Sequence, residues 1–269
     1  DLHLSLRRQR QMCIRDSMHT DFKLSSSGES VFLNDASGNL VDSITFGALP
    51  SNVSYGVSFE NEVYVAYDDP TPGAENDSFE YFGVLGVPLV FSHDGGNING
   101  NIDLEITGDG NEDEIRYTID FTEPDQNSNL YSGPFTNDET TIVRAKPFKE
   151  GYLSLHSNTR NYFFNIESQH PIIHLVSDEY NLFDYDYGIY AYGPPDYGGY
   201  PYFGANFWED WERPVHISYY ENNILEFSAN AGIKIAGAYS RGWDQKSLAL
   251  FARGEYGVCL LYTSPSPRD

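Results

Sequence analysis

The chain has few basic residues and almost no cysteine. It carries 16 Lys and Arg against 40 Asp and Glu, a formal net charge of −24 over 269 residues. Such an acidic chain repels phosphate backbones and anionic lipids, which excludes nucleic acid and an anionic membrane as expected partners. It also lacks an apolar run near the roughly 20 residues that a membrane-spanning helix needs, so we expect no membrane span.

The two cysteines, Cys13 and Cys259, lie in terminal stretches that differ from the rest of the chain. Residues 7–17 ("RRQRQMCIRDS") hold four arginines. A DNA sequence that encodes "MCIRDS" also encodes "CLLYT", the letters that begin at Cys259, when its complementary strand is translated in another frame. This inverted repeat resembles a transposon-end adaptor of a sequencing library. We therefore expect residues 1–17 and 259–269 to be translated adaptor, and the natural protein to continue beyond both.

Without these stretches the chain has no cysteine, 11 basic residues and 37 acidic residues, a net charge of −26. A disulfide framework and a cysteine metal site are then excluded. Short runs of alternating apolar and polar residues, bounded by Gly, Pro, Asn and Asp, predict a mainly β protein. We expect two small immunoglobulin- or fibronectin-like sandwiches followed by an incomplete β-rich unit.

Residues 18–78 are expected to form part of the first sandwich. The runs "ESVFLND" and "NLVDSITFG" flank "ASG", which predicts a hairpin with Gly38 at positive φ. Its one-sided core is expected to contain Val31, Leu33, Leu40, Ile44 and Phe46. The hairpin and the closing "DPTPGAEN" resemble the C-terminal half of a lamin-tail domain, an immunoglobulin-like sandwich. Residues 79–86 are expected to be a linker.

Residues 87–166 are expected to form the second sandwich. "EIRYTID" and "TIVRAKPF" alternate as strands do. With the loop "FTEPDQNSNLYSGPF" they resemble the small fibronectin-like domain at the C-terminal end of chitobiases and β-hexosaminidases, whose pattern is "IRYT.DG.EP…S..Y.GP…TT.VRA.AF..G". Phe121 stands where that family commonly has glycine. The resemblance implies an accessory domain without chemistry of its own.

Two patterns suggest a metal site, but neither is complete. Asp109, Asn111 and Asp113 alternate as in a calcium loop, but the glycine at the sixth position and the glutamate at the twelfth are missing, which favours a solvated hairpin turn. His170 and His174 are four residues apart on an expected strand and lack a third ligand, which favours partly buried structural histidines. We therefore expect no metal site.

Residues 167–258 are expected to form the incomplete third unit. The loop "DYDYGIYAYGPPDYGGYPYFGANF" is expected to fold on its own aromatic rings, although such rings could also stack on sugars. "RPVHISYYE", "AGIKIAG" and "QKSLALFAR" alternate as strands. Together with "NLFD…GIY", "NFW.DWERPVH", "GI.I.G..SR" and "QKSL.L.AR..YG", they resemble the N-terminal part of the spore-coat-protein-H (CotH) kinase-like family. The resemblance implies the beginning of an α+β kinase-like unit.

A kinase of this family would use ATP and Mg²⁺, which the resemblance implies for the full-length parent. By the same resemblance, Lys246 is the candidate phosphate-binding lysine, and Ser240, Arg241 and Gly242 form the loop before it. The alternative is that Lys246 ends a strand edge in solvent. The acids that bind Mg²⁺ and catalyse transfer would lie beyond residue 258. The fragment itself is therefore expected to be inactive and to bind no cofactor.

Three functional hypotheses follow. In the first, the chain is a fragment of a secreted or cell-surface multidomain bacterial protein of the CotH kinase-like family, whose parent is an atypical kinase with a protein substrate. In the second, it is an extracellular array of sandwiches that binds polysaccharide or adheres without catalysis. The third, a glycoside hydrolase, rests only on the enzymes in which the middle domain occurs, and no pair of carboxylates can be assigned roles without geometry.

A truncated third unit would leave strands without partners. We therefore expect exposed apolar edges near Leu248, Leu250 and Phe251, and low stability of this unit.

Overall fold

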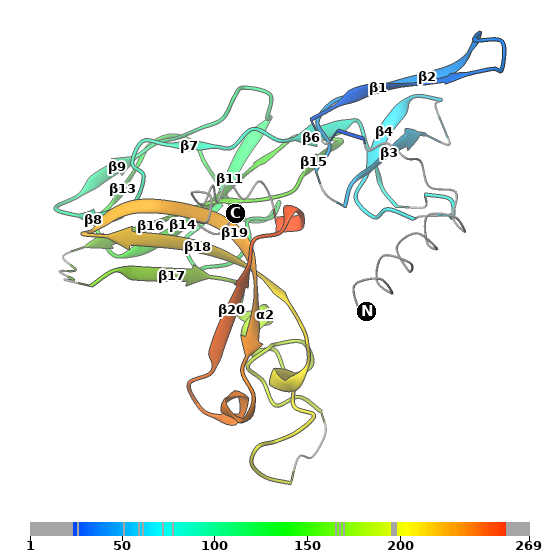
Figure 1. The fold of residues 1–269 in the computed structure, drawn as a ribbon. Helices are drawn as coiled ribbons and strands as arrows, with labels where there is room; N and C mark the ends of the chain where they lie inside the picture. The colour runs from blue at the N-terminus through cyan, green and yellow to red at the C-terminus, as the bar shows by residue number, and fades with distance from the viewer. Residues whose placement is uncertain are drawn as a thin grey trace, which may run out of the picture. The chain divides into compact units, whose positions relative to one another are not determined.

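The protein is mainly β, as predicted (Figure 1). The computed structural model describes residues 24–25, 27–50, 52–58, 60, 62–71, 73–76, 78–164, 166, 168, 170–194 and 198–256. In this part there are twenty strands and one short α-helix, α2 (Glu179–Phe183), and no helix there is long and apolar enough to cross a bilayer. Residues 1–17 and 259–269, expected to be translated adaptor, lie outside the described residues. The chain divides into two compact units at Leu49/Pro50.

The first unit contains the predicted hairpin. Strands β1 (Glu29–Asn34) and β2 (Leu40–Phe46) pair antiparallel, and Gly38 in the turn has φ +85° as expected. The predicted one-sided core is wrong for Leu33 and Leu40, which are both 60% exposed. The physical reason is that, in the described part of this unit, the hairpin is a two-stranded sheet, and two strands cannot bury a face without a second layer.

The segment 79–86, expected to be a linker, contains two strands instead. β5 (Glu80–Tyr81) completes a sheet with β3 (Ser54–Val57) and β4 (Tyr64–Tyr67), while β6 (Gly83–Leu85) pairs in parallel with β15 (Tyr152–Ser154). Between β5 and β6, the backbone N–H of Phe82 donates to the carbonyl of Gly151 at 2.7 Å. These backbone bonds tie the segment to its neighbours.

A sandwich is present between β7 and β16, within the segment expected to hold the second one. Its larger sheet has the order β12-β11-β14-β16-β8, and two smaller sheets, β10-β7 and β13-β9, contribute to the same core. The larger sheet comprises β8 (Gly96–Ile98), β11 (Glu114–Thr118), β12 (Asn129–Leu130), β14 (Thr141–Phe148) and β16 (Asn158–Phe164). The smaller sheets comprise β7 (Val90–Phe91), β9 (Ile102–Leu104), β10 (Ile106–Thr107) and β13 (Phe135–Asn137). The core is filled by Leu89, which precedes β7, and by residues of the strands: Phe91, Leu104, Ile106, Ile115, Val143, Ala145 and Tyr162.

A four-stranded antiparallel sheet follows, with the order β17-β18-β19-β20. Its strands are β17 (Ile172–Val176), β18 (Arg213–Glu221), β19 (Ile224–Ala236) and β20 (Ser247–Phe251), and the three alternating runs predicted as strands fall in the last three of them. One face of this sheet packs on the Tyr-rich loop and buries Ile189, Ala205, Phe207, Val215, Ile217, Ala231, Ile233 and Ile235. The loop folds on its own rings, as predicted: the rings of Tyr192 and Tyr202 meet edge to face with centroids 5.1 Å apart.

The other face of this sheet covers the sandwich, and Figure 1 shows β17–β19 beside β14, β16 and β8. Asn161 Nδ2 donates to Ser218 Oγ at 2.9 Å, and the rings of Phe163 and Tyr220 meet edge to face at 5.2 Å. Gly95 (φ +90°) lies at this contact, where a Cβ atom would come within 2.6 Å of the Asn161 carbonyl oxygen. The second and third predicted domains are therefore packed together, and polar groups are buried between them.

The predicted apolar edge is confirmed for Leu248 and Leu250, which are 37% and 42% exposed on β20, an edge strand of its sheet. Phe251 is half-buried, with the cations of Lys234 and Arg253 near its ring at 5.0 and 5.1 Å.

We expect the amides of β20 to exchange with solvent about 100-fold faster than those of β14, because an edge strand opens without disrupting the core. Hydrogen-exchange mass spectrometry or NMR would measure this. Equal protection of the two strands would show that the edge is not a weak point.

Candidate functional site

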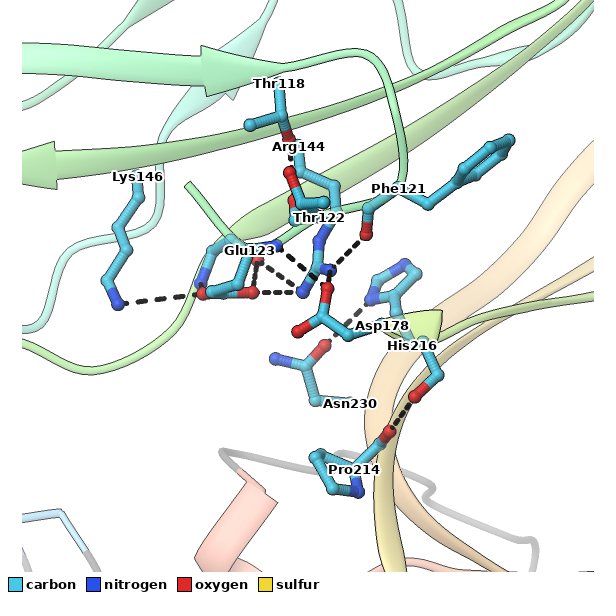
Figure 2. Close-up of polar contacts among 12 residues, drawn as sticks. Thr118, Phe121, Thr122, Glu123, Arg144, Lys146, Asp178, Pro214, His216 and Asn230 are labelled. Atoms are coloured by element: carbon cyan, nitrogen blue, oxygen red, sulfur yellow. Dashed lines mark hydrogen bonds and ion pairs between the residues drawn. The ribbon is translucent and has the colours of Figure 1, made fainter. Parts of the chain in front are cut away.

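A polar cleft of about 370 Å³ lies between the sandwich and the four-stranded sheet. Glu123, Arg144 and Lys146 line it from the sandwich, and Asp178 and His216 from the sheet and the segment after β17 (Figure 2). In this cleft an ion pair joins the two parts, because Arg144 of the sandwich lies 3.2 Å from Asp178.

Arg144 is the centre of the cleft. Its neighbours Val143 and Ala145 enter the sandwich core, so the alternation of β14 turns Arg144 to the opposite face, where it is only 9% exposed. Its guanidinium pairs with the Glu123 carboxylate and contacts Asp178 Oδ1 at 3.2 Å (Figure 2). One side chain thus links a loop of the sandwich to the segment that follows β17.

The carboxylate of Glu123 is satisfied from several sides. The backbone N–H of Ser157 donates to Oε1 at 3.1 Å, its hydroxyl donates to Oε2 at 2.8 Å, and Lys146 Nζ lies 3.6 Å from Oε1. Glu123 and Asp178 thus share one guanidinium, and both carboxylates are paired within the protein.

Asp178 has an unusual role at the start of α2. It occupies the N-cap position with φ −60° and ψ 142°, yet its side chain makes no cap hydrogen bond. Its Oδ1 instead accepts the backbone N–H of Glu123 at 3.0 Å and faces Arg144. Aspartate at this position usually caps the helix with its side chain. In this protein the side chain of Asp178 instead links the four-stranded sheet to the sandwich.

Phe121 stands where the family pattern commonly has glycine, and its backbone keeps a conformation typical of glycine. It has φ +73°, a left-handed conformation that glycine adopts readily and a bulky side chain adopts at a cost. Its carbonyl oxygen accepts the Arg144 guanidinium at 2.6 Å. The turn keeps the backbone shape of the glycine pattern and uses it to hold Arg144.

His216 is the most deeply buried titratable group of the cleft. It is 8% exposed, and its Nδ1 lies 2.8 Å from Asn230 Oδ1, while Nε2 has no hydrogen-bond partner among the described residues. Burial lowers the pKa of His216 to about 4, and the nearby cations of Arg160 and Arg144 act in the same direction. The imidazole is therefore neutral at pH 7.

Lys246, the candidate phosphate-binding residue, makes contacts within the protein. Its Nζ donates to the carbonyl of Trp243 at 2.8 Å and lies 4.1 Å from the centroid of the Phe207 ring. Partial burial lowers the pKa of Lys246. The ammonium therefore stabilises the aromatic loop through a cation–π contact, and it does not simply project into solvent.

The other three candidates lie in the 3₁₀-helix η2 (Tyr239–Gly242). Arg241 donates to the carbonyls of Gly237 and Trp208 at 2.9 and 3.1 Å. Ser240 accepts the backbone N–H of Trp243 at 3.1 Å, and a Cβ atom on Gly242 would lie 3.0 Å from the ring of Tyr200. Arg241 and Lys246 both reach the 3₁₀-helix η1 (Asn206–Trp208), so the fold brings two of the four candidates to the same segment.

The two metal-like patterns make ordinary structural contacts. Asp109 accepts the backbone and side-chain N–H groups of Asn111 at 3.1 and 2.7 Å, which closes a turn. His170 is exposed before β17, whereas His174 on β17 packs edge-on against Phe163 at 5.4 Å. Within the described ranges, no three His, Cys, Asp or Glu side chains are grouped as a metal would require.

The sequence alone did not single out the residues of the cleft. A signal was present for two of them, because Glu123 and Arg144 stand in the "EP" and "VRA" elements of the family pattern. His216 ends the quoted "NFW.DWERPVH" element, but Asp178 stands in none, and the roles of both depend on how the two sheets pack.

Comparison with known proteins identifies one part of the chain. No curated protein and no solved structure matches it. The family model described as "Chitobiase/beta-hexosaminidase C-terminal domain" matches residues 93–159, which include Glu123 and Arg144 but not the segments 18–78 and 167–258. Residues 93–159 are therefore similar to a chitobiase/β-hexosaminidase C-terminal domain, and the structure has a β-sandwich there.

Proposed function

We propose that the chain is a non-catalytic segment of a secreted or cell-surface multidomain protein, in which the sandwich of residues 87–166 is a carbohydrate-associated accessory domain that rigidly holds its neighbour. The cross-link through Arg144 carries this proposal. A buried guanidinium that bonds to Glu123 on one side and Asp178 on the other fixes two sheets in one geometry. Such a joint suits a spacer and positioning domain.

The same proposal assigns the neighbouring segments by their resemblances. Residues 18–78 would belong to a lamin-tail-like sandwich, and residues 167–258 would open a CotH kinase-like unit in a bacterial parent. For ATP to bind here, Lys246 and Arg241 would have to give up their carbonyl and ring contacts. We therefore infer that this segment does not bind Mg²⁺·ATP and that any phosphoryl transfer belongs to other parts of the parent.

Isothermal titration of the full 269-residue chain with Mg²⁺·ATP tests this inference. We expect no saturable binding up to about 1 mM, either in the unchanged chain or in Lys246→Ala. Lys246→Ala should lower the free energy of unfolding by about 1 kcal/mol because a cation–π contact is lost.

Lys149→Ala is the matched control, because Lys149 also lies over an aromatic ring, that of Tyr152 at 4.6 Å, but in the sandwich. Micromolar binding of Mg²⁺·ATP that disappears in Lys246→Ala and persists in Lys149→Ala would replace the accessory proposal with the kinase hypothesis.

A further inference from the structure

A second groove, of about 670 Å³, lies on the sandwich beside β11 and the turn between β14 and β15. Its volume falls in the range of about 300–1,000 Å³ that small-molecule sites usually occupy. It shares no lining residue with the Arg144 cleft. The groove therefore needs an explanation separate from the joint between the sheets.

Aromatic rings dominate part of this groove: Phe79, Tyr81, Phe148 and Tyr152 line it. Phe79 is 65% exposed, and its ring is tilted against that of Tyr81 with centroids 4.9 Å apart. Apolar rings facing water in a concave site are costly unless a ligand covers them. Their flat faces match the C–H face of a pyranose ring.

The cations of the groove are already used within the protein. Arg116 binds both oxygens of Glu114 at 2.7 and 3.0 Å and also donates to the Ser128 carbonyl. Lys149 lies over the ring of Tyr152. An anionic ligand would therefore find no uncommitted positive charge, and a cationic one would compete with Lys149 for the same ring face.

The remaining polar side chains of the groove can form hydrogen bonds with the hydroxyl groups of a ligand. Asp113, Gln126 and Glu150 line the groove and are exposed, with planar amide and carboxylate groups that can bond to hydroxyls. A few such groups next to aromatic rings provide orientation as well as contact area. Rings, planar polar groups and neutralised cations together fit an uncharged polyol.

We propose that this groove is a binding site for neutral oligosaccharides, in which Phe79 stacks on a sugar ring and Gln126 bonds to its hydroxyls. The inference rests on the proposed carbohydrate association of the domain and deepens it by assigning the site and the ligand class. It does not depend on the Arg144 joint, so one can fail while the other holds.

The full chain is titrated with neutral hexasaccharides of glucose, of N-acetylglucosamine and of mannose, and binding is followed by calorimetry. At least one should bind with a dissociation constant of about 1 mM or lower. Phe79→Ala and Gln126→Ala should each weaken that binding about tenfold. Phe82→Ala is the matched control, because Phe82 is 66% exposed but does not line the groove, and it should leave the binding unchanged.

Three results would overturn the proposal. The first is no binding of any of the three hexasaccharides at about 10 mM, and the second is an equal loss of binding in Phe82→Ala and Phe79→Ala. The third is binding of a polyuronate or a lysine-rich peptide in place of the neutral sugars. Phe79 and Gln126 are both exposed, so their replacement should leave the fold intact, and thermal unfolding of each variant verifies this.

Discussion

Replacing Arg144 with Met is expected to lower the free energy of unfolding of the Pro50–Asp269 unit by about 3 kcal/mol. Removing one partner of a buried ion network leaves the others uncompensated, which costs about 3–5 kcal/mol when the site is fully buried. Glu123 and Asp178 are each about one-third exposed, so water screens part of the loss and places the effect at the lower end of that range. Urea unfolding of the chain and of the variant measures the difference.

Arg116→Met is the matched control, because Arg116 also pairs with a glutamate on the same sheet but does not reach the four-stranded sheet. It should cost less than about 1 kcal/mol. Hydrogen exchange adds a second criterion: Arg144→Met should accelerate exchange in β17 and β18 more than in β14. A change below about 1 kcal/mol, or uniform acceleration, would show that Arg144 does not join the two sheets.

Acidification is expected to destabilise the same unit through His216, by about 3 kcal/mol between pH 7 and pH 4. Burial lowers the pKa of His216 to about 4, below the value near 6.5 of an unfolded histidine. As the pH falls, the unfolded chain takes up this proton first, so the stability that is present above about pH 6.5 is lost as the pH approaches 4. The size follows from about 1.4 kcal/mol per pKa unit.

His216→Gln removes this titration and keeps a polar side chain beside Asn230. The variant should be less stable at pH 7, but its loss between pH 7 and pH 4 should be about 3 kcal/mol smaller than that of the unchanged chain. His174 also has a pKa lowered by burial, so His174→Gln shows how much a second histidine of the interface contributes. Identical pH profiles for the chain and His216→Gln would contradict the assignment.

Local pattern was sufficient to predict several of the longer strands. The alternation in "RPVHISYYE" predicted a strand at the residues of β18, and "TIVRAKPF" did so for β14. Alternation gives the two faces of a strand, but it does not show which layer covers each face. The polar face of β14 could therefore not be assigned to an interface, because that depends on Asp178, which is 34 positions from Arg144 along the chain, and on residues farther away.

The candidate site was harder to predict for the same reason. Lys246 and Arg241 were chosen by resemblance, and whether they bind phosphate remains a prediction, while the structure shows the carbonyls and rings they contact. Asp178 follows the ordinary preference for an N-cap position, yet its carboxylate bonds elsewhere. Helix propensity describes how a residue suits its own stretch of backbone. The contacts of Arg144 with Glu123 and Asp178, in contrast, join segments that are separate in the sequence.

The face of the sandwich that packs on the four-stranded sheet affects where such a chain can be divided for expression. Homology outlines residues 93–159, the portion that recurs in other proteins, whereas Asn161 and Phe163 just beyond it are buried against Ser218 and Tyr220. An excised domain would present this face to water, and its neighbour would lose the surface on which it rests. The portion that the family model outlines is therefore smaller than the portion that packs together, and an expression boundary belongs after the last strand of the following sheet.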